Sequence, residues 1–174
     1  METDFKQLFE DARRQVWKKN SEGKLGLNSD ALAVMGFCYM NGYGTEKNDE
    51  QAFTYLSMAV EFGDVESMCW LAQCYMDGIG TKKDEEKGFY YYKKAADLGC
   101  VDGYLGLGLC YMNGTGTVED PDESFYYCKK AADNGAWAAL SALAFCYERG
   151  YGTLQDLEKA EKLRLEYNKK MGNI

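Results

Sequence analysis

The chain repeats one short phrase four times at a constant interval of 36 residues: CYMNGYGT from Cys38, CYMDGIGT from Cys74, CYMNGTGT from Cys110 and CYERGYGT from Cys146. If the phrase occurred only once, a cysteine beside a glycine-rich turn would suggest a nucleophile or a phosphate loop. Four copies in register indicate instead a structural repeat. The phrase also lacks the lysine and the spacing of a phosphate-binding loop. The interval therefore restricts the fold to an array of similar supersecondary units.

Each repeat unit predicts two helices joined by a tight turn. In the first unit, a helix near residues 30–41 is expected to end at Gly42, because glycine accepts the left-handed conformation that terminates helices. A second helix is expected to end at Gly63. It should begin after an N-cap residue whose side-chain oxygen accepts a bond from a helix-start amide. These N-cap residues are Asn48, Asp84, Asp120 and Asp156.

Two further features of the second helices concern their first turns. Gln51 and Glu123 stand three positions after an N-cap, which predicts capping boxes. Pro121 occupies the first helical position, where its missing N–H has no effect on the helix ladder.

The segment LAQCYMDGIGTKKDEEKGFYYYKKAADLG, residues 71–99, resembles the Sel-one-like repeat, a relative of the tetratricopeptide repeat. The resemblance covers about residues 30–172. It implies an all-α fold, a right-handed α-solenoid of about four 36-residue helix-turn-helix repeats with a helix-lined concave surface. Residues 161–172 replace the aromatic and alanine pattern with charges, which suits a terminal cap.

The sequence predicts a short N-terminal region in front of the array. We expect an amphipathic helix and linker over residues 1–28 and the array over residues 29–174, with repeats at about 30–65, 66–101, 102–137 and 138–172. The N-terminal helix could cap the first repeat, lie in the concave groove, or dock into the groove of a second copy. Its apolar side consists of Phe5, Leu8, Phe9, Ala12 and Val16.

The net charge of −8 and the isoelectric point near 4.7 restrict the partners. Nucleic acids and anionic membranes attract clustered Lys and Arg, so both are disfavoured. A basic protein or peptide is the expected partner. The N-terminal residues have charges every few positions, unlike a secretory signal or a membrane span, so we expect a cytoplasmic protein.

The seven cysteines and the absence of histidine bear on metals, cofactors and disulfides. No Cys-x-x-Cys pair is present, so neither a metal site nor a cofactor is expected. Equivalent cysteines on stacked repeats lie roughly 10 Å apart, whereas a disulfide needs α-carbons within about 7 Å. We expect reduced, buried thiols. A secreted bacterial branch of the resembled family carries cysteines at the places of Ala96 and Tyr104, so its disulfides and penicillin binding are not implied here.

Several sets of residues at 36-residue spacing are expected to form the core. On the first helices these are the small residues Gly36, Ala72, Gly108 and Ala144 and their neighbours Met35, Leu71, Leu107 and Leu143. On the second helices they are Tyr55, Tyr91 and Tyr127, with Ala59, Ala95 and Ala131.

The first helices are more apolar than ordinary surface helices, since ALAVMGFCYM (31–40) is apolar on all sides. Their extra apolar surface must either line a binding groove or be buried as core. By analogy with tetratricopeptide repeats, one stripe of these helices lines the concave groove. Large exposed apolar patches usually bind something, although neighbouring repeats could instead bury the stripe as core. The predicted groove consists of the floor residues Phe37, Trp70, Leu109 and Phe145, their neighbours Met40, Gln73, Met76, Leu105 and Met112, and the acidic rim Asp30, Glu66 and Asp102.

These observations favour a non-catalytic interaction module, an adaptor or scaffold that binds a peptide or helix of a partner in the apolar, acid-rimmed groove. Two alternatives remain open: an immunity or inhibitor protein against a basic toxin or effector, and a self-assembling structural repeat protein that associates through its N-terminal helix or the ends of the array. Catalysis is disfavoured, because no histidine can act as a base at neutral pH. Cys69, the one thiol predicted to face the groove, has no basic neighbour to activate it.

Overall fold

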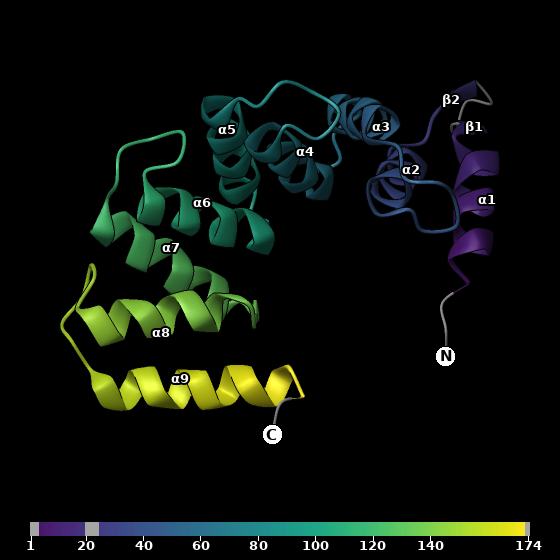
Figure 1. Cartoon of the computed structure of the whole chain (residues 1–174). Coiled ribbons are helices and arrows are strands. Elements are labelled where there is room, and N and C mark those ends of the chain that lie inside the picture. Colours follow the sequence, from purple (N-terminus) through teal and green to yellow (C-terminus); the bar gives the residue numbers. More distant parts are fainter. Residues whose placement is uncertain (1–3, 20–24, 173–174) are drawn as a thin grey trace. The chain divides into compact units, whose positions relative to one another are not determined.

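The computed structural model describes residues 4–19 and 25–172, and these residues form nine α-helices and one two-stranded hairpin (Figure 1). The elements follow one another as α1 Phe5–Gln15, β1 Trp17–Lys19, β2 Leu25–Leu27, α2 Ser29–Asn41, α3 Asp49–Glu61, α4 Glu66–Asp77, α5 Glu85–Asp97, α6 Val101–Asn113, α7 Pro121–Asp133, α8 Ala139–Arg149 and α9 Leu157–Lys170. Helices α2 to α9 are the four predicted helix pairs.

The chain divides into two compact units, residues 1–88 and residues 89–174, and the boundary falls within α5. In the first unit, α1 packs against α2, α2 against α3, and α3 against α4. In the second unit, α6 packs against α7, α7 against α8, and α8 against α9. Figure 1 shows α8 and α9 side by side and running in opposite directions, as expected for a helical hairpin.

The predicted N-caps of the second helices are confirmed. The side chain of Asn48 accepts a hydrogen bond from the backbone N–H of Gln51 at 3.0 Å. The side chains of Asp84, Asp120 and Asp156 likewise each accept a hydrogen bond from the backbone N–H of the residue three positions later. The predicted capping boxes are not formed, because the N-cap amide already has a partner. In the first repeat this amide donates to the carbonyl oxygen of Tyr39 at 2.9 Å, which joins the two helices of the pair.

The glycines that follow the first helices end them as predicted. Gly42, Gly78, Gly114 and Gly150 have φ angles between 65° and 74° and donate their N–H to the carbonyl of the repeated cysteine four residues earlier. This left-handed conformation is one that other residues adopt only with strain.

Helix α1 occupies the position that a second helix holds in the later repeats. The ring of Phe9 meets the ring of Tyr39 edge-on, with centroids 5.3 Å apart. The same contact recurs between the second helix of one repeat and the first helix of the next, at 5.4 Å in each of the pairs Phe53–Tyr75, Phe89–Tyr111 and Phe125–Tyr147. Asp4 caps α1 by accepting from the N–H of Gln7, as Asn48 caps α3. Helix α1 therefore packs on the first repeat in the way that the second helix of each repeat packs on the first helix of the next.

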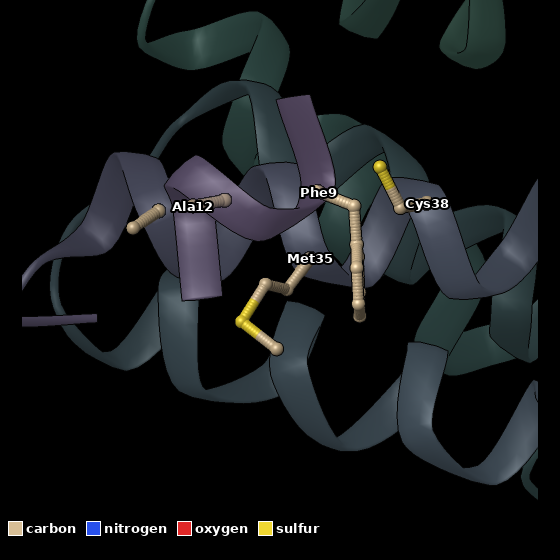
Figure 2. Packing of buried hydrophobic residues seen from close by; sticks show 5 residues of the cluster. Phe9, Ala12, Met35 and Cys38 are labelled. Carbon is tan, nitrogen blue, oxygen red and sulfur yellow. The ribbon is translucent and has the colours of Figure 1, made fainter. Parts of the chain in front are cut away.

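Of the three placements open for the N-terminal helix, the structure has α1 packed on the first repeat. Figure 2 shows Phe9 and Ala12 of α1 beside Met35 and Cys38 of α2, and all four side chains are buried. The turn around Gly44 allows this contact, because a Cβ there would overlap the carbonyl oxygen of Phe5. In the same way, a Cβ at Gly80 would overlap the carbonyl oxygen of Asp49, the first residue of α3.

Most of the predicted core positions are buried, in both units. Leu71 and Leu107 are at most 2% exposed, and the small residues of the first helices and the alanines of the second helices are also buried. The tyrosines Tyr55, Tyr91 and Tyr127 are half-buried. Close helix packing requires these small residues: a Cβ at Gly36 would lie 2.6 Å from the side chain of Leu56.

The hairpin between α1 and α2 was not predicted, since residues 1–28 were expected to hold only a helix and a linker. Trp17 is paired with Leu27 across the two strands, and the N–H of Asn28 donates to the carbonyl of Val16 at 2.8 Å. Over the described residues, no helix is long and apolar enough to cross a membrane.

Candidate functional site

The first unit brings together two of the four predicted floor residues. Phe37 on α2 and Trp70 on α4 have ring centroids 5.1 Å apart, with their planes inclined at 59°. Both side chains are half-buried. Each ring therefore presents part of its surface to solvent while its partner holds it in place.

This ring contact continues through two aromatic residues that sequence reasoning did not include. The ring of Tyr43, in the turn after α2, lies 5.6 Å from that of Phe37. Phe5 at the start of α1 stacks on Tyr43 with centroids 4.4 Å apart. Phe5 and Tyr43 are each 38% exposed. We call Phe5, Tyr43, Phe37 and Trp70 the aromatic row.

Three predicted groove neighbours make core contacts instead. Met40 is only 8% exposed, because it belongs to the buried cluster of Ala52, Leu56 and Cys74, which corrects its assignment to the groove surface. Met76 lies over Gly88, where a Cβ would come within 2.8 Å of its side chain. Leu105 packs against the buried cluster of the second unit that contains Leu107. The apolar stripe is thus partly core and partly surface. Gln73 and Met112 are half-buried.

The second unit exposes the other two predicted floor residues. Leu109 and Phe145 are each 39% exposed. The ring of Phe145 lies 5.9 Å from that of Tyr151, the counterpart of Tyr43 in the fourth repeat. The hydroxyl of Tyr151 donates to Glu119 at 2.7 Å and lies 3.1 Å from the carbonyl oxygen of Met112. Burial and the Glu119 carboxylate raise the pKa of Tyr151 to about 12, so this phenol is neutral and rigidly held.

The predicted acidic rim residues Asp30, Glu66 and Asp102 are all exposed, each in the first turn of a first helix. A carboxylate in this position is stabilised by the helix dipole and remains available to a ligand. Asn41 and Asn113, at the other end of the stripe, each donate to the carbonyl of the predicted floor residue four positions earlier. These amides are therefore already engaged by their own helices.

The thiols do not form part of an exposed site. All seven cysteines are free of disulfides, and all except the half-buried Cys100 are buried. Burial raises the pKa of Cys74 and of Cys128 to about 12 and that of Cys146 to about 11. Cys69 is 8% exposed, which corrects the expectation that it faces the groove. No group of three potential metal ligands occurs in the described part of the chain.

A cavity of about 630 Å³ lies where α1, α2 and α3 meet. Its walls include the stacked rings of Tyr39 and Tyr55, whose centroids are 5.6 Å apart. Arg13 at its edge pairs with Glu10 at 3.7 Å. Sequence reasoning missed this cavity, because it depends on the position of α1 on the first repeat.

Comparison with known proteins extends these observations. The family model described as Sel1 repeat matches residues 29–64, 65–100, 101–135 and 137–163. No curated protein sequence matches the chain significantly. The matched segments cover the first three helix pairs of the structure completely and, in the fourth, α8 and the first half of α9.

Three solved structures are similar to this chain. A Sel1 repeat protein from Oxalobacter formigenes is 26% identical with a TM-score of 0.78 over 95% of this chain. A protective antigen of uropathogenic Escherichia coli with an SLR fold is 25% identical with a TM-score of 0.76 over 97%. Helicobacter pylori cysteine rich protein B is 26% identical with a TM-score of 0.58 over 77%.

The matched share of these three proteins is 61%, 33% and 93%, respectively, so this chain spans less than two thirds of the first two. The helix pairs and these likenesses show that the fold is an all-α repeat solenoid of about four repeats.

Proposed function

Because the chain belongs to the Sel1 repeat family, whose members generally serve as protein–protein interaction modules, we propose that it is a non-catalytic adaptor that binds a peptide or helix of a partner protein. The binding surface consists of the apolar, acid-rimmed faces of the first helices. The observation that carries this proposal is the contact between the partly exposed rings of Phe37 and Trp70.

Partly exposed rings are well suited to anchor a partner. Fully burying a large apolar side chain is worth about 1.5–3 kcal/mol, so completing the burial of a half-buried ring contributes part of that amount. Trp is frequent among the residues that dominate binding energy. Trp70 is also held in place by its packing on the buried cluster of Met40 and Leu56, so little conformational entropy is lost when a partner binds.

The charge of the chain favours a basic partner. The net charge is −8, and the exposed carboxylates of Asp30, Glu66 and Asp102 stand on the same helices as the apolar anchors. Charge complementarity of this kind accelerates association and selects among partners. The proposed ligand therefore combines apolar anchor residues with Lys or Arg at its flanks.

The proposal is tested by affinity capture from native lysate, followed by calorimetric measurement of binding to the captured protein. Trp70→Glu tests the first unit and Leu109→Glu tests the second. We expect one or both variants to lose the partner while retaining the helical circular dichroism of the wild type. Each substitution removes an apolar anchor and puts in its place a carboxylate that would have to lose hydration against the apolar residues of the partner.

Val118→Glu and Leu154→Glu are the matched controls, because these side chains are 81% and 88% exposed in turns between helices. They introduce the same charge and should leave capture unchanged. Equal capture by the wild type, both test variants and both controls would refute binding through the first-helix faces.

A further inference from the structure

The aromatic row is a single surface feature built from four different parts of the first unit. Phe5 comes from α1, Tyr43 from the turn after α2, and Phe37 and Trp70 from α2 and α4. Successive centroids are 4.4, 5.6 and 5.1 Å apart, so each ring contacts the next. Phe5 and Tyr43, at one end, keep more than a third of their surface in solvent.

Phe5 is held in this row by the backbone rather than by its own side chain. The cap at Asp4 fixes where α1 begins, and Phe9 anchors the helix through its contact with Tyr39. The close approach of Gly44 then sets the Phe5 backbone against the turn that carries Tyr43. The Phe5 ring adds little to the buried core, since it is absent from the cluster that contains Phe9 and Ala12.

The part of the chain around the row carries an unbalanced negative charge. Over residues 4–15 and 29–81, which together carry the row, the sequence has eleven carboxylates and four basic residues, Lys6, Arg13, Arg14 and Lys47. Lys47 lies 3.3 Å from Asp49 and is therefore already paired. On helices, residues four apart are neighbours and residues seven apart share a face. Exposed Glu66 thus lies one turn from Trp70, and exposed Asp30 lies two turns from Phe37.

Aromatic faces next to carboxylates suit a planar cation. A guanidinium group stacks on aromatic rings and at the same time bonds to carboxylates, which an ammonium group does less well. The protein already uses cation–ring contacts, since the ammonium group of Lys130 lies 4.2 Å from the ring centroid of Tyr104. The excess of carboxylates in the first unit favours a cation supplied by a partner.

We propose that the aromatic row is a subsite for arginine side chains of the partner segment and that Phe5 of α1 is part of it. This inference rests on the proposed function, because it names the chemistry of the segment that the first unit binds. Helix α1 thereby contributes to ligand binding as well as packing on the first repeat.

A displayed library of short random peptides, selected on the wild type and counter-selected on Trp70→Leu, which keeps an apolar side chain but removes the ring, supplies the probe. We expect the selected peptides to contain arginine. Replacement of that arginine by citrulline, which is neutral and nearly isosteric, should weaken binding about tenfold or more. The affinity should also fall as salt increases. Trp17→Phe combined with Trp137→Phe leaves Trp70 as the single indole, so its fluorescence reports binding at the row.

Phe5→Ala and Leu8→Ala form a matched pair for the role of α1. The two side chains lie on the same helix and are 38% and 37% exposed, and Phe5 belongs to the row through its stacking on Tyr43 whereas Leu8 is not one of its rings. We expect Phe5→Ala to weaken binding about tenfold, as loss of a hot-spot ring does, and Leu8→Ala to change it little. Thermal unfolding of both variants checks that α1 remains folded.

The outcomes separate this inference from the proposed function. Peptides that need Trp70 but bind equally well with citrulline, or bind Phe5→Ala as tightly as the wild type, would overturn the inference and leave the adaptor function standing. A library that yields no peptide dependent on Trp70 would overturn both the arginine subsite and the proposed binding of a partner by the first unit.

Discussion

At the residue scale, Gly152 shows how one missing side chain determines the packing of two helices. Its φ is 64°, and a Cβ there would overlap the carbonyl oxygen of Pro121 at the start of α7. Gly135 has φ of 91° but open space around it. Alanine at either position adopts an unfavourable left-handed conformation, at about 1 kcal/mol. We expect Gly152→Ala to lower the free energy of unfolding by a further 1–3 kcal/mol, roughly the cost of overpacking. Urea unfolding of the two variants measures the difference, and equal destabilisation would contradict the predicted contact.

Single residues also show what the sequence could and could not reveal. The N-cap at Asn48 and the helix stop at Gly42 were predictable, because both depend on the chain a few residues away. Met40 was wrongly assigned to the groove, because its burial depends on how α3 and α4 pack around it. Phe5 and Tyr43 were missed for the same reason.

At the element scale, the sequence contained a signal that α1 packs on α2 as the second helix of each repeat packs on the next repeat. Asp4 and Phe9 are five residues apart, as are the N-cap and the first phenylalanine of α3, α5 and α7. In each of these helices the first residue of the pair is the N-cap, and the phenylalanine five positions later contacts the tyrosine of the following first helix. The hairpin β1–β2 had no such signal, because its strands are only three residues long.

The N-cap of α9 gives a pH-dependent prediction for one element. The N–H of Lys159 donates to Asp156, and this bond, together with the Lys159 ammonium, lowers the pKa of the Asp156 carboxyl below its ordinary 3.8. The carboxylate therefore stabilises the folded state above pH 3.8, and this contribution is lost as the pH falls through the lower folded-state pKa. Asp156→Asn keeps an oxygen for the cap but removes the charge. We expect the wild type to have the higher Tm at neutral pH and the difference to vanish in acid. A Tm difference that stays constant with pH would rule out a charge effect.

At the scale of the whole molecule, the repeated cysteines offer a probe of local unfolding. Burial raises the pKa of Cys38, Cys74, Cys128 and Cys146, so these thiols are neutral as well as inaccessible in the folded protein. Labelling by a thiol reagent requires the surrounding helices to open, because the reactive species is the exposed thiolate. Cys38 and Cys74 report on residues 1–88, and Cys128 and Cys146 report on residues 89–174.

Each repeat in a solenoid contacts only its neighbours, so a core defect is expected to act mainly within its own unit. Leu56 and Leu107 are fully buried, one in each unit, and truncating either to alanine should remove about 2–5 kcal/mol of local stability. Leu56→Ala should therefore accelerate labelling of Cys38 and Cys74 more than that of Cys128 and Cys146, and Leu107→Ala should reverse the order. Mass spectrometry of peptides after timed alkylation gives the rate at each thiol. If both variants accelerated all four thiols equally, the chain would unfold as one cooperative block, and the nearest-neighbour description would not apply.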